Sequence, residues 1–236
     1  MRREYHNWYS QRLGRNMELL VFGHAGAPVL VFPTSRGRFY EYENSGMVQA
    51  LQSKIDNGNV QLYCVDSVDS DSWYNRNIHP HERVVRHVAY ESYVLFEVVP
   101  LMKKLSGANK ISATGCSLGG YHCLNFTLRH PDVVSYCVSM SGAFDMKSFM
   151  NGHYDNDFYF NNPVDYIPNM NDRWFLDQYQ NIKLVLAVGD HDICLGENFH
   201  MADILGRKKI PHWLDVWTGG LQHDWPLWQR MANKFF

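Results

Sequence analysis

The segment that most constrains the fold of this chain is residues 115–119, Gly-Cys-Ser-Leu-Gly. The apolar run at 110–114 predicts a strand before it, and 120–129 predicts a helix after it that ends at Pro131. A serine on such a tight turn takes a strained backbone that lifts its hydroxyl above the sheet, and side chains at 115 or 119 would collide with the adjoining elements. The bare pattern also arises by chance, but the flanking strand and helix favour a reactive hydroxyl at Ser117.

The composition is that of one globular domain covering residues 1–236, with 45% hydrophobic and 19% charged residues. A net charge of −2 with mixed signs provides no basic surface for nucleic acid, and no apolar stretch approaches the roughly 20 residues that cross a bilayer. The first residues lack the apolar core of a secretion signal, and most of the five cysteines lie in or beside apolar runs. We therefore expect a reduced, cytoplasmic protein with neither nucleic acid nor membrane as a partner.

Strands alternate with helices along the chain, which predicts an α/β fold with a mostly parallel sheet covered on both faces. Residues 17–23 and 28–32, joined by a glycine-rich turn, predict an antiparallel hairpin at the N-terminal edge of that sheet. Residues 81–105 predict a long helix that Pro100 kinks or restarts. The remaining predicted elements are strands at 60–66, 133–142, 182–189 and 212–217 and a helix at 197–205.

Residues 144–180 interrupt this alternation, because they are rich in Asn, Asp, Tyr and Phe and show little periodicity. A loop of this length inside a compact domain is usually functional. We interpret it as a lid or pocket wall, or equally as a packed irregular excursion with short helices.

A serine hydroxyl needs a base to take its proton and a carboxylate to orient that base. The order serine, acid, histidine along the chain is typical of the α/β-hydrolase fold. His223 follows the last predicted strand in a glycine-rich loop, and we predict that it is the base. Asp192 and Asp190 both follow the strand at 182–189; we favour Asp192 as the acid, because Asp190 at the strand tip can cap the next turn instead.

Acyl transfer also needs two N–H donors for the oxyanion, one directly after the nucleophile and one from the loop after an early strand. The Leu118 N–H is the first candidate and the Ser35 N–H the second, with flanking arginines that either face the pocket or are solvated surface charges. Trp73, Phe39 and Trp225, with the aromatic stretch 158–160, are predicted to line a short acyl slot.

Several apparent metal or nucleophile signals fail in the sequence. His81 begins a segment like a zinc-protease helix, but a valine occupies the position of the second histidine. Asp155 begins a segment like a calcium loop, but the required glycine and bidentate glutamate are absent. The cluster of Asp66, Asp69 and Asp71 is more simply a polar loop than a metal site. Cys116 is not the expected nucleophile, because the turn presents only its central residue. We expect no metal and no cofactor.

The chain resembles the esterase-D-like branch of the α/β-hydrolases, which includes S-formylglutathione hydrolases, feruloyl and acetyl esterases, and mycolyltransferases. The resemblance rests on four segments from about residue 28 onward: 90–100, 115–120, 140–145 and 219–228. It implies Ser117 as nucleophile, His223 as base, and Ser35 and Leu118 at the oxyanion. The sequence departs from the family at Pro33-Thr34, where many members carry His-Gly, and around the acid.

The resemblance implies a serine carboxylesterase that hydrolyses small-molecule esters through an acyl-enzyme on Ser117, and the predicted aromatic slot favours short acyl chains. Two alternatives stay open at this point, namely acyl transfer to an alcohol or sugar and a non-catalytic binding module built on the same fold. A homo-oligomer is also left open.

Overall fold

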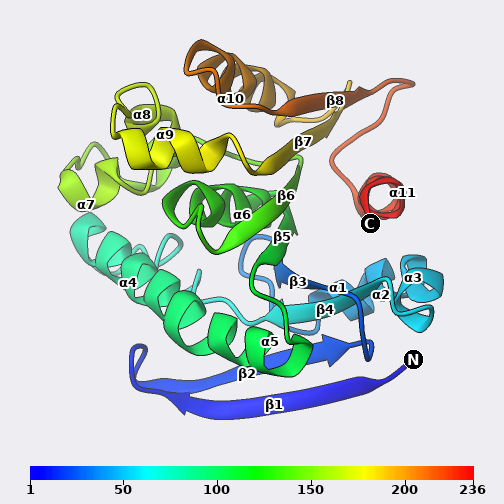
Figure 1. Ribbon diagram of the computed structural model, residues 1–236. Helices are drawn as coiled ribbons and strands as arrows, with labels where there is room; N and C mark the ends of the chain where they lie inside the picture. Colours follow the sequence, from blue (N-terminus) through cyan, green and yellow to red (C-terminus); the bar gives the residue numbers. More distant parts are fainter.

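The computed structural model describes all 236 residues, Met1–Phe236, and is organised around one eight-stranded sheet in the order β1-β2-β4-β3-β5-β6-β7-β8 (Figure 1). The strands are β1 (Arg3–Ser10), β2 (Arg15–Phe22), β3 (Ala27–Phe32), β4 (Val60–Val65), β5 (Ile111–Cys116), β6 (Val134–Met140), β7 (Lys183–Gly189) and β8 (Trp213–Trp217). The pairs β1–β2 and β2–β4 are antiparallel, and all other neighbours are parallel. The predicted α/β class, with a mostly parallel sheet and an antiparallel N-terminal edge, is therefore confirmed.

The expected hairpin between 17–23 and 28–32 is wrong. Strand β2 pairs with β1 on one side and β4 on the other, while β3 lies between β4 and β5. The true hairpin partner is Arg3–Ser10, whose outermost position leaves alternate side chains exposed, so that it carries no apolar run to mark it as a strand. Polar outer faces are ordinary for antiparallel edge strands, whereas the fully buried β4 and β5 gave clear apolar signals.

Helices cover both faces of the sheet (Figure 1). One core joins the sheet to α4 (Pro80–Tyr93), α5 (Val99–Ser106), α6 (Leu118–Arg129), α9 (Arg173–Tyr179) and α10 (Leu195–Arg207). A second core, on the other face, joins it to α1 (Glu41–Asn44), α2 (Met47–Ala50), α3 (Gln52–Asp56) and α11 (Trp225–Phe235). No helix has the length and apolar character needed to span a bilayer.

The helix predicted at 81–105 is present, and residues 80–106 are helical without a break. Helix α4 runs into the π-helical turn η1 (Val94–Val98), and α5 follows it directly from Val99. Pro100 has no N–H to continue the helical hydrogen-bond ladder, and the π-helical turn lies just before it, where that ladder is disturbed.

Residues 144–180 form short helices packed against the core: η2 (Met146–Phe149), α7 (Asn156–Tyr159), α8 (Pro163–Tyr166) and α9. Phe144, Phe158 and Tyr179 are fully buried in this segment, and the Tyr179 hydroxyl donates to the carbonyl of Leu128. The alternative of a packed excursion with short helices thus describes its architecture. A role as a lid or pocket wall stays a prediction.

Candidate active site

Ser117 occupies a strained turn between β5 and α6, with φ 57° and ψ −122°. The two flanking glycines are required by close approach, because a Cβ on Gly115 would lie 2.2 Å from the Gly119 carbonyl oxygen. A Cβ on Gly119 would lie 2.5 Å from the carbonyl oxygens of Phe32 and Pro33. Such a backbone costs about 1–3 kcal/mol and persists only where the surroundings impose it. The same contacts bring the loop after β3 directly against this turn.

Asp192 and His223 meet at the carboxyl ends of β7 and β8. The Asp192 carboxylate is buried, and its Oδ1 lies 2.8 Å from Nδ1 of His223. Its Oδ2 accepts a 2.6 Å hydrogen bond from the hydroxyl of Ser141, which in turn accepts from the indole N–H of Trp228. The Cys194 N–H donates to Oδ1 as well. Burial alone would raise the pKa of Asp192, but these hydrogen bonds outweigh it and lower the pKa below the ordinary value, so the group is an anion at neutral pH.

Asp190 does not reach the histidine ring. Its carboxylate accepts hydrogen bonds from the backbone N–H groups of Gly219, Gly220 and Leu221, at 2.8, 3.3 and 2.8 Å. These bonds lower the pKa of Asp190, and they hold the loop that carries His223. The two carboxylates therefore differ in what they contact: Asp192 bonds the imidazole, and Asp190 bonds the backbone before it.

Three strands that are neighbours in the sheet present Ser117, Ser141 and Asp192 at one edge, because β5, β6 and β7 are parallel and end side by side. The Ser117 N–H donates to the Met140 carbonyl, which ties the Ser117 turn to the end of β6. The hydrogen bonds of the His223 ring end at Asp192, and none joins it to the Ser117 hydroxyl. Catalytic hydrogen bonds often tighten only when substrate binds.

The two predicted oxyanion donors have no hydrogen-bond partner within the protein, since neither the Ser35 nor the Leu118 N–H donates to another protein atom. The N–H groups on either side of Ser35 are both taken. Thr34 donates at 2.7 Å to Glu41, and Arg36 donates at 3.2 Å to Asp69. The loop therefore leaves one N–H free between two that are fixed by carboxylates.

Asp69 also bonds His122, at 3.0 Å from Oδ1 to Nε2, and both side chains are almost fully buried. His122 lies in the second turn of α6 and stacks on Phe32, the last residue of β3. Sequence reasoning missed this pair, and it missed Glu41, Ser141 and Trp228 as site residues. Ser141 and Trp228 lie inside two of the segments that carry the family resemblance, 140–145 and 219–228, and this position was the one sequence signal that could have identified them as site residues.

The three predicted pocket residues belong to two different cores, Trp73 to the first, and Phe39 and Trp225 to the rim of the second. Trp73 is only 1% exposed and packs on His87 and Phe158 in the core, so it does not line an open slot, and that assignment is corrected. Phe39 contacts Tyr5 and Tyr40 near the N-terminal edge. Trp225 is half-buried and packs edge-to-face on Trp228, whose ring packs in the same way on His223.

The acidic residues of loop 66–71 have separate partners and do not converge. Asp66 bonds Arg38, Asp69 bonds His122, and Asp71 bonds Arg15. Arg38 also pairs with Glu18, so that Glu18, Arg38 and Asp66 form one ion-pair network. The Cys116 thiol is buried, and burial raises its pKa well above the ordinary value.

The largest surface hollow, about 980 Å³, lies away from these residues. It is lined by Ser135, Lys183 and Trp213 among others, which lie at the amino ends of β6, β7 and β8. Ligands of open parallel sheets bind beyond the carboxyl ends of the strands. The hollow is therefore at the wrong end of the sheet to serve Ser117.

The sequence profile of a family described as "Putative esterase" matches residues 10–230. No curated protein matches the sequence. Among solved structures, a ferulic acid esterase superposes with a TM-score of 0.77 at 15% identity, over 100% of this chain and 98% of that one. The S-formylglutathione hydrolase FrmB from Staphylococcus aureus gives 0.71 at 17% identity, over 99% and 94%. An S-formylglutathione hydrolase from Agrobacterium tumefaciens gives 0.76 at 12% identity, over 98% and 92%. At these identities the superpositions establish a shared fold.

Proposed function

The chain belongs to this esterase family and is a serine hydrolase, and from that premise we propose that it cleaves small carboxylic esters through an acyl-enzyme on Ser117. His223 is the base and Asp192 the residue that orients it. The acyl group is short, acetyl to butyryl.

The observation that carries the proposal is the hydrogen bond from His223 to the buried, ionised Asp192 at the edge where Ser117 is presented. An ionised carboxylate only accepts, so Nδ1 must carry the proton and Nε2 keeps its lone pair. That tautomer is the one that can take a proton from a serine hydroxyl.

In the first half-reaction the Ser117 Oγ attacks the ester carbonyl while His223 Nε2 takes the hydroxyl proton. The oxyanion lies between the free N–H groups of Ser35 and Leu118, each of which is worth on the order of 3 kcal/mol of transition-state stabilisation. The C–O bond to the alcohol then breaks, and His223 returns the proton to the departing oxygen. Water attacks the acyl-serine in the same way and releases the acid.

A short acyl chain is supported by the absence of any sizeable hollow lined by Ser117 or His223 among the larger ones in the structure. Trp225 and Trp228 add bulk beside the histidine. Each acyl methylene that finds no apolar surface forfeits about 0.8 kcal/mol of burial.

The test uses a fluorophosphonate probe, which phosphonylates activated serines, followed by p-nitrophenyl esters of increasing chain length. We expect one label per chain on the native protein, none on Ser117→Ala, and full labelling of the matched control Ser53→Ala, whose hydroxyl is exposed on α3. Equal labelling of Ser117→Ala would overturn the proposal.

No labelling of the native protein would instead favour a non-catalytic binding module. If the protein is labelled but forms a new ester when an alcohol or sugar is added, in preference to free acid, the reaction is acyl transfer rather than hydrolysis.

A further inference from the structure

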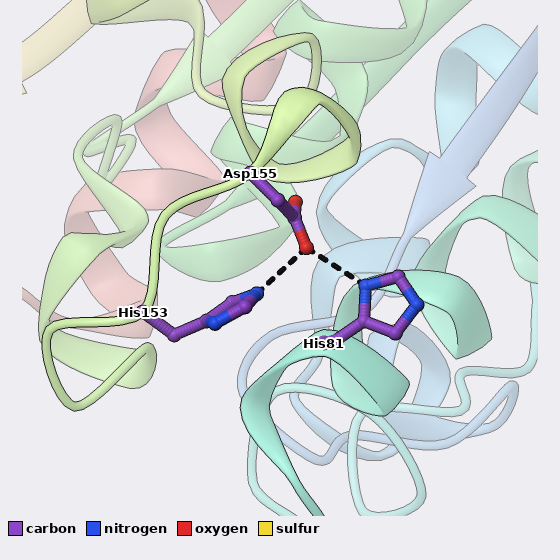
Figure 2. Close-up of side chains that lie close together, drawn as sticks. All are labelled: His81, His153 and Asp155. Carbon is purple, nitrogen blue, oxygen red and sulfur yellow. Dashed lines mark hydrogen bonds and ion pairs between the residues drawn. The ribbon is translucent and has the colours of Figure 1, made fainter.

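Outside the catalytic edge, two histidines and an aspartate from distant segments converge on one point (Figure 2). His81 lies in the first turn of α4, whereas His153 and Asp155 lie in the turn between η2 and α7. Asp155 Oδ2 is 2.7 Å from His81 Nδ1 and 2.7 Å from His153 Nε2. Figure 2 shows the two imidazole rings pointing at this oxygen from opposite sides.

The carboxylate is held in place by the helix that it caps. Asp155 Oδ1 accepts a 2.8 Å hydrogen bond from the Phe158 N–H at the start of α7, which leaves Oδ2 for the imidazoles. The carboxylate therefore presents Oδ2 to both imidazoles in a fixed orientation.

The two rings are also positioned by their elements. His81 is fixed by α4, where its own N–H donates to Nδ1 of His79, the N-cap residue. His79 packs edge-to-face on His153, with ring centroids 5.0 Å apart. His153 is 28% exposed and His81 is 48% exposed, so an ion from solvent can reach both.

We propose that His81, His153 and Asp155 bind a divalent transition-metal ion of the zinc class. Two imidazole nitrogens and one carboxylate oxygen are a donor set that such ions accept, and the three donor atoms already lie within 4.8 Å of one another. Bonds of about 2.0–2.2 Å require that Oδ2 move aside and that the three side chains adjust around the ion that enters between them. Water completes the coordination.

Binding changes the protons in a defined way. Without an ion, both ring nitrogens donate a proton to the same oxygen. With the ion, His81 coordinates through Nδ1 and carries its proton on Nε2, and His153 coordinates through Nε2 and carries its proton on Nδ1. Any second proton on either ring is released, so affinity falls as the pH is lowered.

The ion would join the start of α4 to the excursion at 144–180. Phe158, one turn beyond the cap, packs edge-to-face on the buried Trp73, so the junction lies directly over the core. An ion that binds only the folded state stabilises it, and a dissociation constant of about 1 µM would raise the Tm by about 5–10 °C at 100 µM ion. The inference does not depend on the proposed esterase activity.

The experiment is a titration of metal-stripped protein with Zn²⁺ by calorimetry, together with Co²⁺ titration followed by absorbance. We expect one equivalent bound, a Tm increase with Zn²⁺, and a Co²⁺ spectrum without a thiolate-to-metal band. His153→Gln and Asp155→Asn should each weaken binding on the order of 100-fold, and the asparagine still caps α7. Two variants serve as controls: His200→Gln removes another exposed histidine, and Asp157→Asn alters an exposed aspartate two residues from Asp155. Both should bind Zn²⁺ like the native protein.

Two results would overturn the proposal. The first is no binding of Zn²⁺ at 100 µM by the native protein, which would leave only a hydrogen-bonded cap. The second is equal binding by the native protein and His153→Gln, with a thiolate band, which would place the ion at the other converging set, Asp192, Cys194 and His223. A variant that fails to fold is recognised by its circular dichroism, and His81→Gln, at an exposed ring, then takes its place.

Discussion

Two Asp–His pairs flank the serine turn, and they differ in what surrounds the imidazole. Asp192–His223 is joined through Nδ1 at 2.8 Å, with the histidine side chain 19% exposed. Asp69–His122 is joined through Nε2 at 3.0 Å, with the histidine 3% exposed and stacked on Phe32. The other nitrogen of the first imidazole, Nε2, has no hydrogen-bond partner within the protein. The second is enclosed, and its aspartate uses its other oxygen to hold the Arg36 N–H beside Ser35.

We propose that the same pair of residue types has two different tasks, proton transfer at Asp192–His223 and positioning of backbone donors at Asp69–His122. The two pairs differ in the exposure of the imidazole and in which ring nitrogen is hydrogen-bonded to the carboxylate.

The largest effect is expected at the serine and its base. Ser117→Ala should lower kcat/KM by roughly four to six orders of magnitude, His223→Ala by a similar factor, and the double variant by little more, because the residues act as a unit. The measurement is p-nitrophenyl acetate hydrolysis with each variant. Additive losses in the double variant would show that the two residues do not share one mechanism.

The next effect separates the two carboxylates that follow β7. Asp192→Asn should lower kcat by about 10⁴-fold, because the histidine loses its anionic partner and its tautomer is no longer fixed. Asp190→Asn should cost about tenfold or less, since an amide oxygen still accepts from the loop N–H groups. Parallel kinetics of the two variants measure this, and the reverse order would make Asp190 the acid.

A smaller loss is expected at the enclosed pair. Asp69→Asn should lower kcat by about 10- to 100-fold with KM nearly unchanged, because a displaced Ser35 N–H weakens only the transition state. Asp71→Asn, whose carboxylate pairs with Arg15, is the matched control and should keep native kcat. A loss of 10⁴-fold in Asp69→Asn would instead place that pair in the proton transfer itself.

The enclosed side should also be the acid-sensitive part of the fold. Burial, followed by the neighbouring His122, lowers the pKa of His87 from 6.5 to about 3. The unfolded chain therefore binds a proton below pH 6.5 that the folded protein refuses, so stability is complete above that pH and is lost as the pH falls towards 3. The free energy of unfolding should drop by about 2 kcal/mol between pH 7 and pH 5 from this group alone.

Urea unfolding at the two pH values measures this, with His87→Gln as the comparison because glutamine does not titrate. The variant should show a flatter pH dependence even if it is less stable at pH 7. An equal slope in both proteins would mean that the acid sensitivity arises elsewhere.

The buried strands and the serine turn could be predicted from the sequence because each is a local pattern. Apolar runs mark β4 to β7, and the Gly-x-Ser-x-Gly spacing reflects a close approach within a few residues. The Asp192–His223 pair followed from its order along the chain. Contacts between distant segments carry no such mark. The hairpin partner of β2, the Asp69–His122 pair and the meeting of His81 with Asp155 depend on tertiary packing, and His81 and Asp155 had each failed a local motif.

The smallest effect concerns acyl length at the exposed pair. If the slot beside His223 is narrow, kcat/KM should fall by about fourfold for each methylene beyond butyryl, which corresponds to about 0.8 kcal/mol of burial that is not gained.

Trp225 packs on Trp228, and Trp228 packs on His223 and donates to Ser141, so Trp225 either lines the slot or only supports the histidine. A selective gain by Trp225→Ala on hexanoyl and octanoyl esters identifies a wall residue, since truncation opens space for carbon. An equal loss on every chain length identifies a support residue, because a displaced base slows all substrates alike. A native preference for octanoyl esters would contradict the narrow slot. It would mean that the exposed pair, Asp192–His223, faces a long apolar channel, in contrast to the enclosed pair.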